Sequence, residues 1–249
     1  MKNDKRKAAK VGIFSFTCCE GCQLQILDLW DRLLEMLRYI DISYFKLADE
    51  KNVMGRFDIA IVEGAISEKE ELEKLKKIRE NSKLLVVIGE CAVSGGIPAM
   101  RNVKKIRRPK MLPKTQSVDR HVKVDYRLRG CPIEREEFLS LITSLLVDRM
   151  PQEINHPVCM ECNQREIECL MLKGIPCMGP ITCAGCNALC PAAGTPCEGC
   201  RGTMKDAGIR QLKVRLEEIG VSRKMIKNML ERFSSDEIKG MERAKNDRK

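Results

Sequence analysis

The chain is poor in the side chains that stack on nucleic-acid bases or move protons. Its 249 residues include one Trp, three Tyr and two His. So few aromatics offer no stacking surface for bases, and no recognisable nucleic-acid motif accompanies the net charge of +10. We therefore expect no nucleic-acid partner, and we interpret the charge as a solvated face or a complement to an acidic partner subunit. His121 and His156 are expected at the surface, and no residue is assigned a catalytic role.

Long apolar runs are also missing. No stretch is long enough to span a bilayer, and the run 11–16 is too short for the apolar region of a secretory signal. Fourteen cysteines would indicate a disulfide scaffold in a short secreted chain. Without a secretory signal, we expect a cytoplasmic protein whose cysteines are kept reduced for metal, with no membrane span.

Nine of the cysteines crowd between positions 159 and 200. They are Cys159, Cys162, Cys169, Cys177, Cys183, Cys186, Cys190, Cys197 and Cys200. Pairs spaced C-x-x-C with single cysteines between them suit 4Fe–4S clusters, each of which takes four thiolates. The alternative is structural zinc, which also uses four cysteines. The irregular spacing and the Cys190-Pro191 pair favour iron–sulfur, and eight of the nine would serve two clusters.

The first 150 residues alternate between apolar strands and amphipathic helices. The pattern predicts strands at 11–16, 42–47, 57–62, 84–88 and 122–126, and helices at 24–39, 68–81 and 134–147, with Ser67 as the N-cap of the second helix. The stretch 94–120 is expected to be a loop. Such alternation predicts an α/β fold with a flavodoxin-like parallel sheet.

Cysteines follow several of these predicted strands. Cys19, Cys22, Cys91 and Cys131 each occupy a loop directly after one. Because the carboxyl ends of parallel strands meet at one edge of a sheet, these thiols could converge on a third cluster. The alternative is a set of buried, inert thiols.

Composition divides the chain into three parts. We expect a flavodoxin-like domain at 1–152, a cysteine-rich ferredoxin-like segment at 153–203 and a helical tail at 204–249. The middle segment has no strong apolar period, so metal would hold it together. In the tail, helices are predicted at 209–219 and 223–233, and 241–249 is expected to fray.

Several motifs together resemble a known family. The stretches 17–23 (TCCEGCQ), 89–98 (GECAVSGGIP) and 129–132 (RGCP) resemble the small subunit of NiFe hydrogenases. The stretches 177–182, 184–191 and 197–202 are similar to the delta subunit of cytoplasmic sulfhydrogenases, relatives of the viologen-reducing hydrogenases of methanogens.

The resemblance implies three 4Fe–4S clusters in a line. Cys19, Cys22, Cys91 and Cys131 would hold a proximal cluster beside a nickel–iron site on a large subunit. Cys159, Cys162, Cys169 and Cys177 would hold a medial cluster, and Cys186, Cys190, Cys197 and Cys200 a distal one. Ligands could cross between the last two clusters. Cys18 and Cys183 lie outside this pattern, and Glu20 and Gln23 are expected to be solvated loop residues.

The function implied is that of an electron-transfer subunit within a hydrogenase, an oxidoreductase acting on hydrogen. It would relay electrons between the large subunit, which carries the nickel–iron centre, and an acceptor subunit with flavin and iron–sulfur groups. One alternative is the homologous subunit of a complex I-like or other hydrogenase-derived complex that lacks nickel. Another is a zinc-stabilised scaffold or basic nucleic-acid adaptor.

Overall fold

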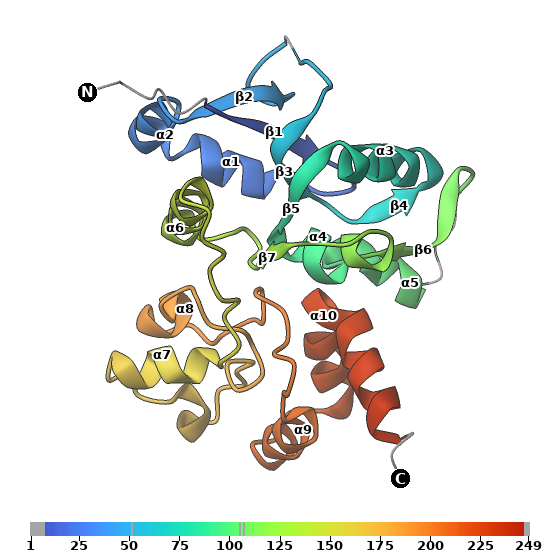
Figure 1. The fold of residues 1–249 in the computed structure, drawn as a ribbon. Helices are drawn as coiled ribbons and strands as arrows, with labels where there is room; N and C mark the ends of the chain where they lie inside the picture. The colour runs from blue at the N-terminus through green and yellow to red at the C-terminus, as the bar shows by residue number, and fades with distance from the viewer. Residues whose placement is uncertain (1–7, 51, 105, 107, 247–249) are drawn as a thin grey trace.

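A five-stranded parallel sheet organises the N-terminal half of the computed structural model, which describes residues 8–50, 52–104, 106 and 108–246. The strands are β1 (Ala9–Ser15), β2 (Ile40–Phe45), β3 (Phe57–Glu63), β5 (Ser82–Ile88) and β7 (Tyr126–Leu128). Their order in space is β2-β1-β3-β5-β7, the flavodoxin-like arrangement (Figure 1). The predicted fold class is confirmed.

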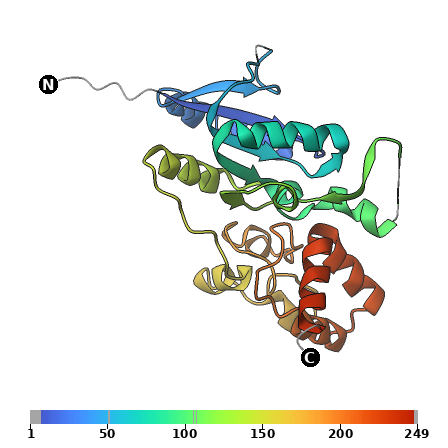
Figure 2. The same ribbon diagram turned by 45° about the vertical axis from the view of Figure 1, so that its right-hand side comes forward.

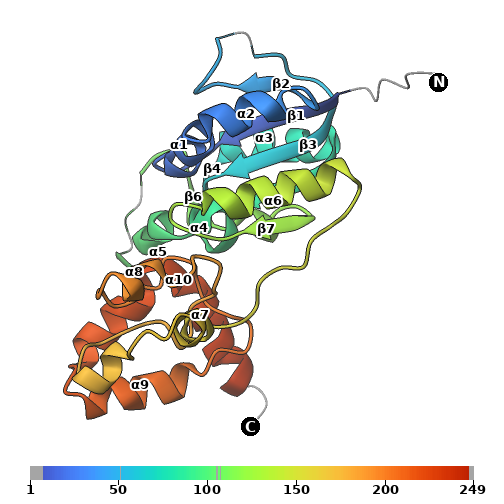
Figure 3. The same cartoon turned by 90° about the vertical axis from the view of Figure 1, so that its left-hand side faces the viewer.

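Helices cover both faces of this sheet. On one face lie α1 (Gly21–Leu27), α2 (Trp30–Met36) and α6 (Arg135–Leu146), and on the other α3 (Lys69–Glu80) and α4 (Gly89–Ser94) (Figures 1 and 3). Side chains alternate between the two cores along each strand. On β5, Val86 and Ile88 enter the core beneath α1 and α6, whereas Leu85 and Val87 pack beneath α3 and α4. This two-sided burial explains the nearly uniform apolar strands.

The predicted helix 24–39 is wrong in its bounds. The chain forms two short helices, and the first begins at Gly21. Ile26 is fully buried and Leu27 packs against the core, whereas Leu24 and Leu34 are 51% and 55% exposed, so the spaced leucines do not share one buried face. The helix begins early because the Glu63 carboxylate accepts the backbone N–H groups of Cys22 and Gln23, as an N-cap would.

The predicted loop 94–120 contains regular structure. It includes the 3-10 turns η1 (Ile97–Ala99) and η2 (Val118–Arg120), the helix α5 (Met100–Lys104) and the strand β6 (Met111–Gln116). β6 pairs antiparallel with the short strand β4 (Ile66–Glu68). Ser67 therefore lies in a strand, where its hydroxyl bonds that of Thr115, and Glu68 caps α3 instead.

Two strand predictions are displaced along the chain. The strand predicted at 42–47 runs from Ile40 to Phe45, and the one at 122–126 begins only at Tyr126. The bounds predicted for β1, β3, α3, β5 and α6 agree with the structure to within about two residues, the usual ambiguity of element ends.

The C-terminal half forms a separate layer below the sheet (Figure 2). Its elements are α7 (Val158–Gln164), the 3-10 turn η3 (Leu170–Lys173), α8 (Leu189–Ala192), α9 (Ile209–Glu218) and α10 (Arg223–Asn246). Val158 and Met178 of the cysteine-rich segment share one apolar core with Leu212, Ile226 and Leu230 of the tail. The tail is thus part of the packing around the cysteines.

The last helix is longer than predicted. α10 passes a kink at Ser234 and continues to Asn246, so 241–246 is helical rather than frayed, and 247–249 lie outside the described residues. In the part of the chain that the structure describes, no helix is both long and apolar enough to cross a membrane.

Candidate functional site

Four cysteines, which we call the sheet-edge thiols, gather at the carboxyl edge of the parallel sheet. They are Cys19, Cys22, Cys91 and Cys131, which follow β1, β5 and β7. Cys22 and Cys91 lie in the first turns of α1 and α4, not in loops as predicted. The helices begin immediately after the strands, which brings both thiols to the same edge.

Burial and mutual proximity govern the chemistry of these thiols. Burial raises the pKa of Cys91, and the neighbouring Cys131, Cys18 and Cys19 raise it further. Burial also raises the pKa of Cys22, together with the charge of Glu63. Without a metal, such thiols hold their protons at neutral pH. A cation that bound them would displace the protons and offset the charge of the thiolates.

Glycine makes room for one of these sulfurs. Gly89 has φ +80°, and a Cβ on it would lie 2.5 Å from Cys22 Sγ. A residue with a side chain would be strained there and would push the sulfur aside. The turn between β5 and α4 is therefore shaped around a thiol of a different segment.

A buried carboxylate supports the same edge. Glu63 ends β3 and is 2% exposed, and it accepts the Nε2–H of Gln23 at 3.0 Å besides the backbone N–H groups at the start of α1. Gln23 is itself 2% exposed, so the expectation of a solvated loop residue is wrong. Glu20, half-buried at φ +60°, accepts the Ser15 hydroxyl. In the sequence, Glu63 was visible only as the end of a predicted strand.

Two further groups of thiols lie in the lower layer. We call Cys159, Cys162, Cys169 and Cys177 the α7 thiols, and Cys186, Cys190, Cys197 and Cys200 the α8 thiols. Within the first group, burial raises the pKa of Cys159 to about 12, with contributions from Cys177, Cys162 and Cys169. Within the second group, burial raises the pKa of Cys200 to about 11, and the neighbouring Cys186 and Cys190 contribute to this increase.

Backbone groups point at the sulfur of Cys177. The N–H groups of Gly179 and Cys197 approach Cys177 Sγ at 3.5 and 3.3 Å. Burial raises the pKa of Cys197 to about 12, and both Cys177 and Cys200 add to it, so Cys197 lies between the two lower groups. Donors aimed at sulfur favour a thiolate, and they also tune the potential of a cluster bound to it.

Glu161 joins the two lower groups. This residue of α7 accepts the backbone N–H groups of Gly185 and Ala188, at 2.7 and 2.9 Å, and contacts Cys186 Sγ at 3.8 Å. Gly185 and Ala188 both have positive φ, so the loop is tightly folded around the carboxylate. The sequence shows Glu161 only as a charge inside a C-x-x-C pair, and no spacing rule links it to position 186.

The sheet-edge thiols adjoin the lower layer at Cys200 and Arg201. Burial raises the pKa of Cys200, and the nearby backbone of Cys131 lowers it by a smaller amount. Arg201, the next residue, donates to the backbone carbonyl of Arg129 at 2.9 Å. The α8 thiols thus adjoin the sheet edge, although the resemblance implied that the α7 thiols would take the middle place.

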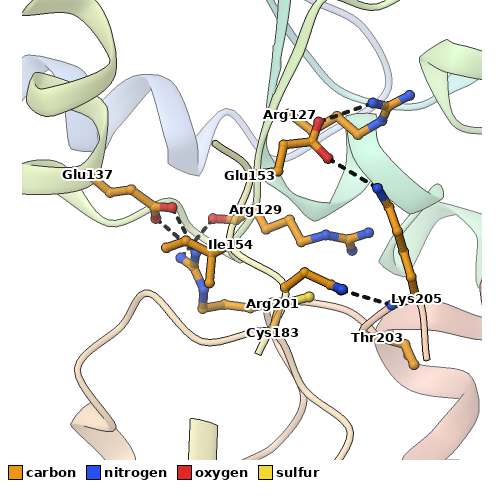
Figure 4. Close-up of a pocket in the computed structure, with 10 residues that line it drawn as sticks. Arg127, Arg129, Glu137, Glu153, Ile154, Cys183, Arg201, Thr203 and Lys205 are labelled. Atoms are coloured by element: carbon orange, nitrogen blue, oxygen red, sulfur yellow. Dashed lines mark hydrogen bonds and ion pairs between the residues drawn. The ribbon is translucent and has the colours of Figure 1, made fainter. Parts of the chain in front are cut away.

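The two cysteines outside the pattern lie in different surroundings. Cys18 is half-buried near the sheet-edge thiols, and burial followed by the charge of Glu63 raises its pKa to about 12. Cys183 is 2% exposed and lines a cavity of about 50 Å³ with Arg129 and Arg201 (Figure 4). Burial raises the pKa of Cys183 to about 11, although Arg129 lowers it.

A charge network lies between the layers. Arg129 Nη1 donates to Glu90 Oε1 at 3.0 Å and Arg129 Nη2 to Glu237 Oε1 at 2.7 Å, while Arg201 pairs with Glu137 at 2.8 Å (Figure 4 shows the last pair). Burial alone would lower the pKa of Arg129, but the two carboxylates raise it above its usual value. Burial raises the pKa of Glu90 to about 7 despite the opposing effect of Arg129.

The donor set fits iron–sulfur clusters in number and chemistry. Each thiol group offers four sulfurs, and the glycine at position 89 leaves room beside one of them. Among the described residues, no three His, Cys, Asp or Glu side chains converge as ligands of one metal ion. A cubane takes one thiolate on each of four irons, which spaces its ligands more widely than those of a single ion.

Known proteins share both the sequence and the fold. The family model described as NADH ubiquinone oxidoreductase, 20 Kd subunit, matches residues 19–145. The sulfhydrogenase 2 subunit delta of Pyrococcus furiosus is 36% identical over 84% of this chain and 93% of its own. A vhu subunit of the F420-non-reducing hydrogenase of Methanocaldococcus jannaschii is 31% identical over 78% of this chain and 82% of its own.

A solved structure agrees with these relatives. A crystal structure of an NAD+-reducing NiFe hydrogenase superposes with a TM-score of 0.54 at 29% identity, and it covers 59% of this chain and 96% of that one. The sheet with cysteines along its carboxyl edge defines the class, an iron–sulfur subunit of the 20 Kd-subunit type. The chain belongs to this family, among its NiFe hydrogenase small subunits of the delta type.

Proposed function

We propose that this chain is the electron-transfer small subunit of a NiFe hydrogenase. Three 4Fe–4S clusters, held by the sheet-edge, α8 and α7 thiols, would relay electrons from the nickel–iron site of a large subunit to a flavin and iron–sulfur partner. The observation that supports the proposal is the proximity of the cysteines: Cys22 lies against the turn before Cys91, the Cys197 N–H of the α8 set approaches Cys177 Sγ of the α7 set, and Cys91, Cys159 and Cys200 each interact with other cysteines of their own set. Iron–sulfur clusters take up and release single electrons, and the chain provides no nickel–iron centre of its own.

The order of the sets supports a path for the relay. The hydrogen bond from Arg201 to the Arg129 carbonyl and the position of Gly202 against Glu90 and Arg129 support the α8 thiols as the middle site, with the α7 thiols at the far end. Cys19 and Cys169 are exposed, whereas Cys22 and Cys177 are buried, so each terminal site has an open side. A large subunit would approach beside Cys19, and an electron acceptor beside Cys169.

The test is anaerobic isolation of the native complex. We expect nickel from a copurifying large subunit, about twelve irons in this chain as three four-iron clusters, and hydrogen-dependent reduction of a dye. A complex with these clusters but without nickel or hydrogen-dependent activity would support a second candidate. That candidate is a subunit of a complex I-like complex, which the description of the matched family favours. A colourless zinc protein would contradict both.

A further inference from the structure

The contact between the sheet edge and the α8 thiols depends on a third segment, the C-terminal tail. Gly202 follows the last α8 thiol by two residues and lies directly against the Glu90–Arg129 pair. Its φ is +69°, and a Cβ on it would overlap Glu90 Oε1 and Arg129 Nη1. Glu90 precedes Cys91, and Arg129 stands two residues before Cys131. The ion pair therefore lies between two segments that carry cysteines.

Glu237 of α10 completes this buried set of charges. It receives Arg129 Nη2 at 2.7 Å and Nη1 at 3.5 Å, so the guanidinium is held in a forked contact. The Oε2 of Glu237 also accepts the backbone N–H of Thr203 at 3.2 Å. One tail carboxylate thus binds the sheet-edge side of the contact and the lower-layer side simultaneously.

The helix that carries Glu237 is itself anchored to the sheet domain. The Ser94 hydroxyl of α4 donates to the Phe233 carbonyl at 2.9 Å, beside the kink at Ser234. The side chain of Glu90 is 0% exposed and that of Arg129 17% exposed. Within the described part of the chain, Glu90 Oε2 has no hydrogen-bond partner. Arg129 is therefore shared between two carboxylates, Glu90 and Glu237, and the loss of either would leave a buried charge with one partner fewer.

We propose that Glu237 is a positioning residue for electron transfer, which fixes the sheet-edge thiols against the α8 thiols by orienting Arg129 between them. The inference rests on the proposed function, because it requires clusters at both sets of thiols. With the Glu237 carboxylate removed, Arg129 would turn toward Glu90 alone, and the Gly202–Thr203 segment would lose its tie to the tail. The clusters at the sheet-edge thiols and at the α8 thiols would then be held less rigidly relative to each other, although no ligand is lost.

The test compares the complete chain in its anaerobic native complex with two variants. Glu237→Gln keeps the size of the side chain and removes the charge. The matched control, Glu217→Gln, removes the same charge from an exposed ion pair with Arg223 between α9 and α10. Three quantities are measured: iron content, hydrogen exchange of the 89–95, 127–134 and 199–205 backbone, and the magnetic coupling between neighbouring reduced clusters by electron paramagnetic resonance.

In Glu237→Gln we expect full iron content. Hydrogen exchange in the three stretches should be at least about tenfold faster, because one partner of a buried ion pair is gone. The magnetic coupling between the clusters at the sheet-edge thiols and the α8 thiols should be weakened or broadened. Glu217→Gln should match the wild type. Equal coupling in both variants would overturn the inference, even if exchange becomes faster, because the role would then be structural only. If Glu237→Gln does not fold, Glu237→Asp is judged by the same criteria. Missing clusters in the wild type and the control would instead overturn the proposed function, and this inference with it.

Discussion

At the scale of single residues, neighbouring cysteines have different surroundings, and we therefore expect them to have different roles. Cys186 lies in a tight loop held by Glu161 and interacts with Cys200, whereas Cys183, three residues earlier, faces Arg129 and Arg201. Spacing rules alone treat the two as equivalent candidates. The structure separates them by the groups that surround each sulfur.

This difference predicts the result of a paired substitution. Cys186→Ala should remove one cluster, about four irons per chain, because a cubane needs four thiolates. Cys183→Ala should leave the iron content unchanged and cost at most a modest amount of stability from a small cavity. Iron analysis and visible absorbance of both purified variants provide the measurement. Equal iron loss in the two variants would show that Cys183 is a ligand.

A glycine pair tests whether the turn between β5 and α4 is shaped around sulfur. Gly89→Ala introduces a Cβ at positive φ and 2.5 Å from Cys22 Sγ, while Gly174→Ala meets positive φ (+75°) with nothing within 4 Å. Both should lose about 1–2 kcal/mol of stability from backbone strain. Only Gly89→Ala should also lose the sheet-edge cluster, seen as about four fewer irons. Full iron content in Gly89→Ala would contradict the close packing described here.

His121 gives a prediction for acidic pH. Burial lowers the pKa of His121, and Lys76 lowers it further. The unfolded chain therefore binds more protons than the folded one below about pH 6.5, so this residue makes stability fall as the pH falls. His121→Gln should reduce that dependence, which urea unfolding at pH 7 and pH 5.5 would measure. An unchanged pH dependence of stability in His121→Gln would contradict a lowered pKa of His121 in the folded chain.

At the scale of elements, the sequence predicts best where one pattern leaves no choice. The strands β3 and β5 are apolar on both faces and are clear in the sequence, as is α6 with its charged first turn followed by apolar residues at helical spacing. The helix predicted at 24–39 was wrong because the burial of Ile26 and the hydrogen bonds from the backbone to Glu63 determine where α1 begins, and the leucine spacing does not. β4 and β6 are short strands that only their mutual pairing reveals.

The α7 helix and the α8 loop should be coupled through Glu161. Glu161→Gln retains the size of the side chain but weakens its acceptance of the Gly185 and Ala188 N–H groups, which a carboxylate receives more strongly. We expect the free energy of unfolding to fall by about 1–3 kcal/mol. The electron paramagnetic resonance signal of a cluster at the α8 thiols should broaden. Glu166→Gln, an exposed change just after the same helix, is the control. Identical signals in both variants would show that Glu161 does not shape the site.

At the scale of the whole molecule, the two layers differ in what stabilises them. The sheet domain has two apolar cores, whereas the lower layer has one core shared between the cysteine-rich segment and the tail. The sequence suggested that metal holds the cysteine-rich segment, and the contribution of the tail was hidden because its partners are distant. Arg129 and Glu237 are 108 residues apart, beyond the reach of any local pattern.

Removal of iron should therefore unfold the lower layer and leave the sheet domain folded. Treatment with a chelator and an oxidant should expose 158–203 to protease, because buried protonated thiols replace metal bonds there. A fragment containing the sheet domain should survive. Mass spectrometry of the digest identifies the cut sites. Cleavage spread evenly over both layers, or none at all, would contradict this division.

Twelve of the fourteen cysteines are proposed to form three four-iron sites. The most direct measurement is iron and acid-labile sulfide per chain in the anaerobically isolated protein, combined with Mössbauer spectroscopy to identify the cluster type. We expect about twelve irons per chain, all in cubane clusters. About eight irons or fewer, or zinc in place of iron, would contradict it.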